Sequence, residues 1–223
     1  MIRLTHGRVK LALHPLRESA GPALLCLHAV GGSGLDFAGA AAHWPGPVFG
    51  LDFSGHGDSE PLRGGAYAPE VLAGDADAAL AHVGPACLAG SGVGAYVALL
   101  LAGARPDLVP AALLLPGPGL AGGGPSPDHA GRAAPRWVED GAAAPPGSDP
   151  AVRRLEWDLR PPDYADAFAR AARRLLLADG GDAPPPWWEA VRASPTAQAA
   201  PGDVAGALAQ LARVGREAPQ RAG

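Results

Sequence analysis

The chain has 223 residues, a formal net charge of −4 and a hydrophobic fraction of 48%. This length allows one domain with a sizeable core. The charge is mildly acidic and no basic patch interleaves with aromatic residues, so the composition argues against a nucleic-acid-binding protein. No apolar run reaches the ~18 residues of a membrane span, and the N-terminus lacks the apolar core of a signal peptide. We therefore expect a cytoplasmic protein with no membrane association.

The two cysteines, Cys26 and Cys87, lie within apolar strand patterns. Such positions favour buried free thiols in a reducing compartment over a disulfide or a metal pair. No metal-ligand spacing and no cofactor motif is recognised elsewhere, so the sequence predicts neither a metal site nor a cofactor.

Apolar runs and alternating patterns predict strands through the first half of the chain. The segment Ala-Leu-Leu-Cys-Leu-His at 23–28 is a continuous apolar run, as expected for a strand buried on both faces of a parallel sheet. The predicted strands cover residues 2–6, 9–16, 23–28, 48–53, 85–89 and 111–115. Helical spacing follows at 69–83 and 93–104. Strands that alternate with helices predict an α/β fold with a doubly wound, mostly parallel sheet.

Glycine and proline, 32 and 25 residues, become frequent after residue 115. The pattern there predicts a short lid or excursion at 121–160 within a single domain, whose core comprises 1–120 and 161–214. Limited proteolysis is expected to cut first between residues 121 and 150. Further elements are predicted at the end of the chain: helices at 162–173, 187–193 and 204–214, and strands at 174–178 and 196–200.

A glycine-rich turn at residues 90–94 joins the fifth predicted strand to the helix that follows. Its sequence is Gly-Ser-Gly-Val-Gly, with glycines at alternate positions. Glycines are needed where a turn is strained and where two elements approach closely. With Gly90 and Gly94 as the small flanking residues, Gly92 occupies the tip of the turn.

Three motifs in order resemble those of α/β-hydrolases, in particular the short hydrolases of actinobacterial genomes. Residues 28–33 (HAVGGS) are similar to the family's oxyanion loop, and residues 52–59 (DFSGHGDS) to the turn after the next strand. The turn at 90–94 resembles the nucleophile elbow. The resemblance covers about residues 1–120 well and implies the α/β-hydrolase fold.

The resemblance also implies a catalytic serine, acid and histidine in that chain order, and two of these positions are empty here. Gly92 stands where the family has its nucleophile. The acid position, after the strand near Ala178, offers Asp179 or Asp182. The histidine position lies near residues 201–203, yet no histidine follows His129. Whether the chain is an enzyme is therefore left open.

Two other residues offer alternative routes to catalysis. Ser91 is a candidate nucleophile, although it places the β-branched Val93 at a position that needs a small residue. Asp52 is a candidate base for activating water, although a role in bracing its turn fits better. His28 and His56 are expected to brace the loops that contain them, and His129 lies in the loose segment. Trp187 and Trp188 are expected to pack at the sheet edge, and Tyr96 in the core.

The backbone of the active site is expected to survive. The resemblance assigns the oxyanion hole to the amides of Ala29 and Val93, and a helix N-terminus adds partial positive charge. His28, Ala29, Ser91, Gly92 and Val93 are therefore the predicted ligand-binding residues. The favoured function is a catalytically degenerate protein that binds a small carbonyl- or carboxylate-bearing molecule. The alternatives are an active esterase or thioesterase and a non-catalytic partner or scaffold protein; the oligomeric state is not predicted.

Overall fold

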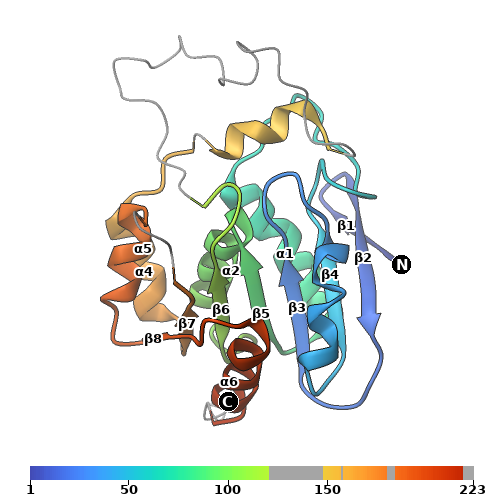
Figure 1. The fold of residues 1–223 in the computed structure, drawn as a ribbon. Coiled ribbons are helices and arrows are strands. Elements are labelled where there is room, and N and C mark those ends of the chain that lie inside the picture. Colours follow the sequence, from blue (N-terminus) through green and yellow to red (C-terminus); the bar gives the residue numbers. More distant parts are fainter. Residues whose placement is uncertain (121–147, 157, 180–183, 218–223) are drawn as a thin grey trace.

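A computed structural model describes residues 1–120, 148–156, 158–179 and 184–217 (Figure 1). Within these residues the chain forms an eight-stranded sheet in the order β1-β2-β4-β3-β5-β6-β7-β8. The strands are β1 (Ile2–His6), β2 (Val9–Arg17), β3 (Ala23–Leu27), β4 (Val48–Asp52), β5 (Ala86–Ser91), β6 (Ala112–Leu115), β7 (Leu175–Leu177) and β8 (Ala197–Ala199).

The sheet is mostly parallel, as predicted. β2 runs antiparallel to its neighbours β1 and β4, and every other neighbouring pair is parallel. The carboxyl ends of the parallel strands therefore meet at one edge of the sheet, which is the upper edge in Figure 1. In open α/β sheets this edge is where ligands bind.

Helices cover both faces of the sheet because successive strand residues point to opposite faces. Along β3, Leu25 and Leu27 pack into a core shared with α1, α2, α4 and α5, whereas Leu24 and Cys26 face α6. Cys26 and Cys87 are buried free thiols.

The helices are α1 (Pro69–Val83), α2 (Val93–Ala104), α4 (Pro162–Ala171), α5 (Pro186–Arg192) and α6 (Val204–Glu217), with 3-10 helices η1 (Gly34–Phe37), η2 (Ala40–His43) and η4 (Pro150–Glu156).

The end of the predicted excursion is attached to the core. η4 buries Val152 and Leu155 and lies over the carboxyl edge of the sheet (Figure 1). Just before it, the amide of Asp149 donates to the carbonyl of Gly55 at 2.8 Å. The rest of the predicted excursion, residues 121–147 and 157, lies outside the described residues, as do His129 and Asp182. Among the described helices, none combines the length and apolarity needed to cross a bilayer.

Candidate functional site

The glycine-rich turn lies at the carboxyl edge, between the end of β5 at Ser91 and the start of α2 at Val93. Gly92 is the residue before α2 and has φ +59° and ψ −121°, a conformation that L side chains rarely adopt. A Cβ on Gly90 would lie 2.1 Å from the carbonyl oxygen of Gly94, and one on Gly94 would lie 2.2 Å from that of Leu27. The strand and the helix therefore approach too closely for larger residues.

Two main-chain amides beside the turn point at one oxygen. The amide of Val93, at the N-terminus of α2, donates to the carbonyl of Pro118 at 3.2 Å, and the amide of Val30 donates to the same oxygen at 3.3 Å. An amide after the elbow tip and an amide from the loop after β3 are the two donors of an α/β-hydrolase oxyanion hole. The sequence assigned the second amide to Ala29, and the amide that meets the Pro118 oxygen here is that of Val30.

Pro118 belongs to the loop after β6, residues 116–120 (PGPGL), which we call the plug. The plug covers Gly92 closely: a Cβ on Gly92 would lie 2.0 Å from the Pro118 oxygen. A side chain at the nucleophile position and the plug in its present place are therefore mutually exclusive. No motif in the sequence predicts this contact, although the alternating glycines and prolines of the plug allow a close approach.

Ser91, the candidate nucleophile, is partly exposed and is tied to the plug. Its Oγ donates to the carbonyl of Pro116 at 2.9 Å. A nucleophilic serine needs a base that accepts its proton. Here the acceptor is a main-chain carbonyl, which cannot take up that proton.

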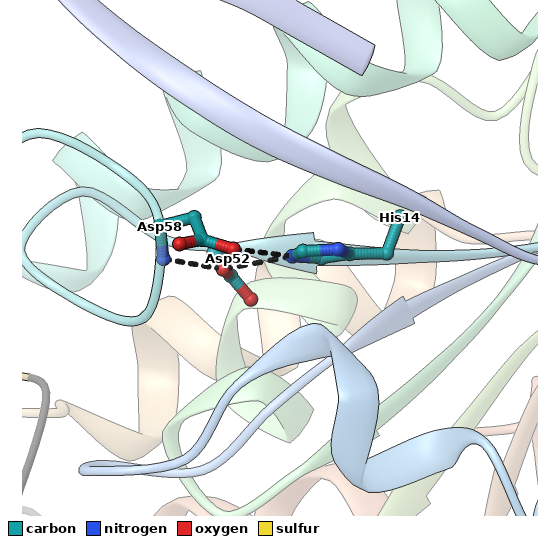
Figure 2. A group of neighbouring side chains, drawn as sticks. All are labelled: His14, Asp52 and Asp58. Atoms are coloured by element: carbon teal, nitrogen blue, oxygen red, sulfur yellow. Dashed lines mark hydrogen bonds and ion pairs between the residues drawn. The ribbon is translucent and has the colours of Figure 1, made fainter. Parts of the chain in front are cut away.

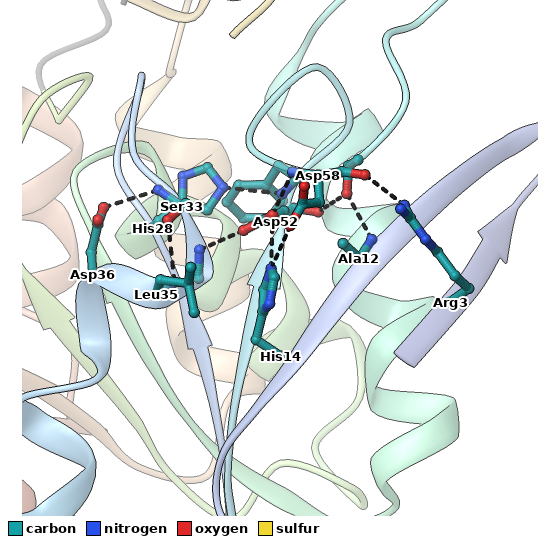
Figure 3. A network of polar contacts seen from close by, with 12 residues as sticks. Arg3, Ala12, His14, His28, Ser33, Leu35, Asp36, Asp52 and Asp58 are labelled. Carbon is teal, nitrogen blue, oxygen red and sulfur yellow. Dashed lines mark hydrogen bonds and ion pairs between the residues drawn. The ribbon is translucent and has the colours of Figure 1, made fainter. Parts of the chain in front are cut away.

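Asp52 lies at the end of β4, is 1% exposed, and braces the surrounding loops (Figure 3). Its Oδ1 accepts from the amide of Gly34 at 2.7 Å, and its Oδ2 accepts from the amide of Asp58 at 2.8 Å. The Nε2 of His14, on β2, lies 2.9 Å from the same Oδ2. With three donors around a buried carboxylate, Asp52 is placed to hold two loops and β2 together and not to activate water.

His14, Asp52 and Asp58 also form a group whose ligand-type atoms lie within 4.8 Å of one another (Figure 2). Such a set can in principle hold a cation. Both oxygens of Asp52 already accept hydrogen bonds, and Asp58 Oδ2 lies 4.0 Å from His14 Nε2. We therefore assign the group to bracing.

His28 and His56 lie side by side in the core, with ring centroids 4.7 Å apart. His28 donates from Nδ1 to the carbonyl of Ala29 at 2.7 Å and accepts at Nε2 from the amide of Phe53 at 3.0 Å. Both nitrogens are used, so His28 links the oxyanion loop to the turn after β4. Burial lowers the pKa of both histidines, which are held neutral.

The acid and histidine positions of the predicted triad lie after β7 and before α6. Asp179 follows β7 and lines a surface cavity of about 380 Å³, together with Arg192 and Gln198. At the histidine position, Asp203 accepts from the amide of Gly206 at 2.7 Å and so caps the start of α6.

Two residues that the sequence did not assign to the site hold the plug from its far side. Arg160 donates from Nη1 to the carbonyls of Gly119 and Leu120, the second at 2.7 Å. The indole nitrogen of Trp187 donates to the carbonyl of Leu120 at 2.9 Å. Trp187 and Trp188 are buried, and Trp187 packs against Tyr96 at a centroid distance of 4.9 Å.

Comparisons with known structures bear on the fold of the chain. A hypothetical protein from Pseudomonas aeruginosa is 22% identical, with a TM-score of 0.65 and 96% of each chain covered. An α/β hydrolase from Sphaerobacter thermophilus is 18% identical, with a TM-score of 0.63 and coverage of 96% of this chain and 99% of that one. The bottromycin epimerase BotH, solved in complex with bottromycin A2, is 19% identical, with a TM-score of 0.59 and coverage of 97% and 96%.

A comparison with protein-family models and one with curated proteins find no match. The structural likeness shows that the chain has the α/β-hydrolase fold.

Proposed function

We propose that this chain is a catalytically degenerate α/β-hydrolase-fold protein that binds a carbonyl or carboxylate oxygen of a small molecule at its oxyanion hole. The observation that carries the proposal is the pair of amides, Val30 and Val93, that converge on the carbonyl oxygen of Pro118. A ligand oxygen that replaces the Pro118 oxygen would receive the same two hydrogen bonds.

A serine hydrolase also needs a nucleophile and a histidine base, and the lack of both argues against efficient hydrolysis. Gly92 has no side chain at the tip of the turn, and the sequence contains no histidine after His129. Within the described residues, the buried histidines nearest the oxyanion loop, His28 and His56, are neutral and bonded to main chain. Covalent catalysis needs a nucleophile with an adjacent base, and neither is supplied here.

The hole itself keeps its chemistry because it is built from backbone. Two N–H donors and the N-terminus of a twelve-residue helix favour an oxygen that carries partial or full negative charge. A short-chain carboxylate or an amide carbonyl fits this description, and a hydroxyl group fits it less well. The fold is compatible with a non-hydrolytic role, because one structural neighbour is an epimerase.

Binding can be tested by titrating ¹⁵N-labelled protein with sodium butyrate and following the amide resonances of Val30 and Val93. We expect both resonances to shift together and to saturate. Butan-1-ol, which has the same chain length without the anionic oxygen, serves as the control and should leave both unchanged. Butyrate shifts spread over exposed lysine and arginine positions, with none at these two amides, would refute binding at the hole.

Catalysis can be tested on the same preparation. We expect no burst with p-nitrophenyl acetate and no covalent label from a serine-directed phosphonate. The Ser91→Ala variant should hydrolyse the ester at the background rate of the parent protein. Stoichiometric phosphonate labelling at Ser91, lost in Ser91→Ala, would establish the esterase alternative instead.

A further inference from the structure

Arg160 lies just before α4, is 4% exposed, and reaches two segments of main chain. Its Nη1 donates to the carbonyls of Gly119 and Leu120 in the plug, and its Nη2 donates to the carbonyl of Leu155 in η4 at 2.8 Å. The side chain therefore joins the plug to the segment that lies over the carboxyl edge.

The burial of Arg160 is unfavourable in itself. Within the described residues its guanidinium makes no ion pair, and its Nε is buried without a hydrogen-bond partner. Burial lowers the pKa of Arg160 to about 10. The nearby carboxylate of Asp158 attracts the guanidinium without forming an ion pair, and a buried charge also needs hydrogen-bond partners. The bonds that Arg160 makes end on main-chain carbonyls, two of them in the plug.

Aromatic residues complete this contact. The guanidinium carbon of Arg160 lies 5.1 Å from the centre of the Tyr96 ring, a cation–π distance. Tyr96 packs edge-on against Trp187, and Trp187 donates to the carbonyl of Leu120. We call Arg160, Tyr96 and Trp187 the clamp.

On its other side the plug accepts a bond from Ser91 Oγ at the Pro116 carbonyl, at 2.9 Å, and two bonds from the oxyanion-hole amides at the Pro118 oxygen. Pro118 is exposed, and the two bonds to its oxygen, at 3.2 and 3.3 Å, are longer than the clamp's bonds to Leu120. The hole amides are neutral donors, whereas Arg160 is a charged one, and charge-assisted hydrogen bonds are about twice as strong. The position of the Pro118 carbonyl is thus governed mainly from the clamp side.

We propose that Arg160 is the positioning residue that keeps the plug in the oxyanion hole, so that the hole opens to a ligand when Arg160 releases the carbonyls of Gly119 and Leu120. The first half of this proposal stands on the contacts alone, and the second half rests on the proposed function. Because the hole opens only for part of the time, the apparent affinity for a ligand is reduced by the fraction of molecules that are open.

The test is amide hydrogen exchange at Val30 and Val93 in the Arg160→Met variant, which keeps the length of the side chain and removes its donors. Exchange reports local opening. We expect both amides to exchange faster by about tenfold or more than in the parent protein. The amide of Leu88, bonded to the carbonyl of Ala111 in the sheet, serves as the internal reference and should be unchanged.

Two further variants keep the test decisive. Arg105→Met removes an exposed arginine that is paired with Asp77 at the other end of α2, and it should leave the exchange of Val30 and Val93 unchanged. Trp187→Phe removes one donor to Leu120 and keeps an aromatic ring, and it should accelerate the same two amides to a smaller extent. This variant carries the test if Arg160→Met does not fold.

Unchanged exchange at Val30 and Val93 in folded Arg160→Met, or an equal increase at Leu88, would overturn the positioning role. A butyrate titration of the same variant separates the two proposals. Faster exchange with tighter butyrate binding supports both. Faster exchange without any butyrate binding supports the clamp and refutes the proposed function. Equal butyrate binding in both proteins with unchanged exchange supports the proposed function and refutes the clamp.

Discussion

Replacing Gly92 with alanine tests whether the plug and a side chain at the tip of the turn exclude each other. The new Cβ would lie 2.0 Å from the Pro118 oxygen, so the carbonyl has to move and lose its bonds to Val30 and Val93. Each lost bond costs about 0.5–1.5 kcal/mol, or about 1–3 kcal/mol for the pair. The backbone conformation of residue 92 adds about 1–3 kcal/mol for a residue with a Cβ. The expected loss of unfolding free energy is therefore about 2–6 kcal/mol.

Gly7→Ala is the control for adding a Cβ at a positive φ where no neighbour is met. Gly7 has the same φ of +59°, and nothing lies within 4 Å of the Cβ that alanine would add. We expect this variant to lose only about 1–2 kcal/mol. A larger loss in Gly92→Ala than in Gly7→Ala is expected from the contact with the plug.

Urea unfolding, followed by tryptophan fluorescence, gives both free energies on one scale. In a thermal melt, the loss in Gly92→Ala corresponds to a Tm that is lower by roughly 4–24 °C for a domain of this size. In the double variant Gly92→Ala/Arg160→Met, the loss of unfolding free energy should be smaller than the sum of the losses in the two single variants. The reason is that a plug already released by Arg160→Met no longer collides with the new Cβ. Equal losses in Gly92→Ala and Gly7→Ala, or strict additivity in the double variant, would refute a plug seated in the hole.

The remaining predictions concern catalysis, pH and the brace at Asp52. Gly92→Ser should give no marked gain in p-nitrophenyl acetate hydrolysis, because the same collision applies and no base stands behind the serine; a large gain would show that a base had been overlooked. Burial raises the pKa of Asp158 from 3.8 to about 6, so its proton is held more tightly in the folded state and stability should fall as the pH rises through that window. Asp158→Asn should flatten this fall, as measured by urea midpoints at about pH 4 and about pH 7; an unchanged slope would assign it to another group. Asp52→Asn should lower the unfolding free energy by about 2–4 kcal/mol, because the side-chain NH2 of asparagine would face N–H donors where the carboxylate oxygen now accepts. A change below about 0.5 kcal/mol in a urea titration would contradict the bracing role of Asp52.

The sequence alone determined the order of strands and helices, because the hydrophobic period of each element is a local property of the chain. It also determined that Gly92 stands at the tip of the turn and that no histidine follows His129. The ends of most strands shifted by one or two residues, since the last residues of an element depend on its neighbours. The role of Asp52 was anticipated, whereas its partner His14 was not, because that pairing depends on the register between β2 and β4.

Only the tertiary structure decided what covers the amides of Val30 and Val93. Val30, Val93 and Pro118 come from the loops after β3, β5 and β6, and no local pattern predicts that three such loops place one carbonyl against two amides. The amide of Val30, and not that of Ala29, meets the Pro118 oxygen because the direction of each amide depends on the dihedral angles of its loop. Arg160 was missed for a related reason: its charge is read in the sequence as solvent-exposed, and only the folded chain surrounds it with main-chain carbonyls.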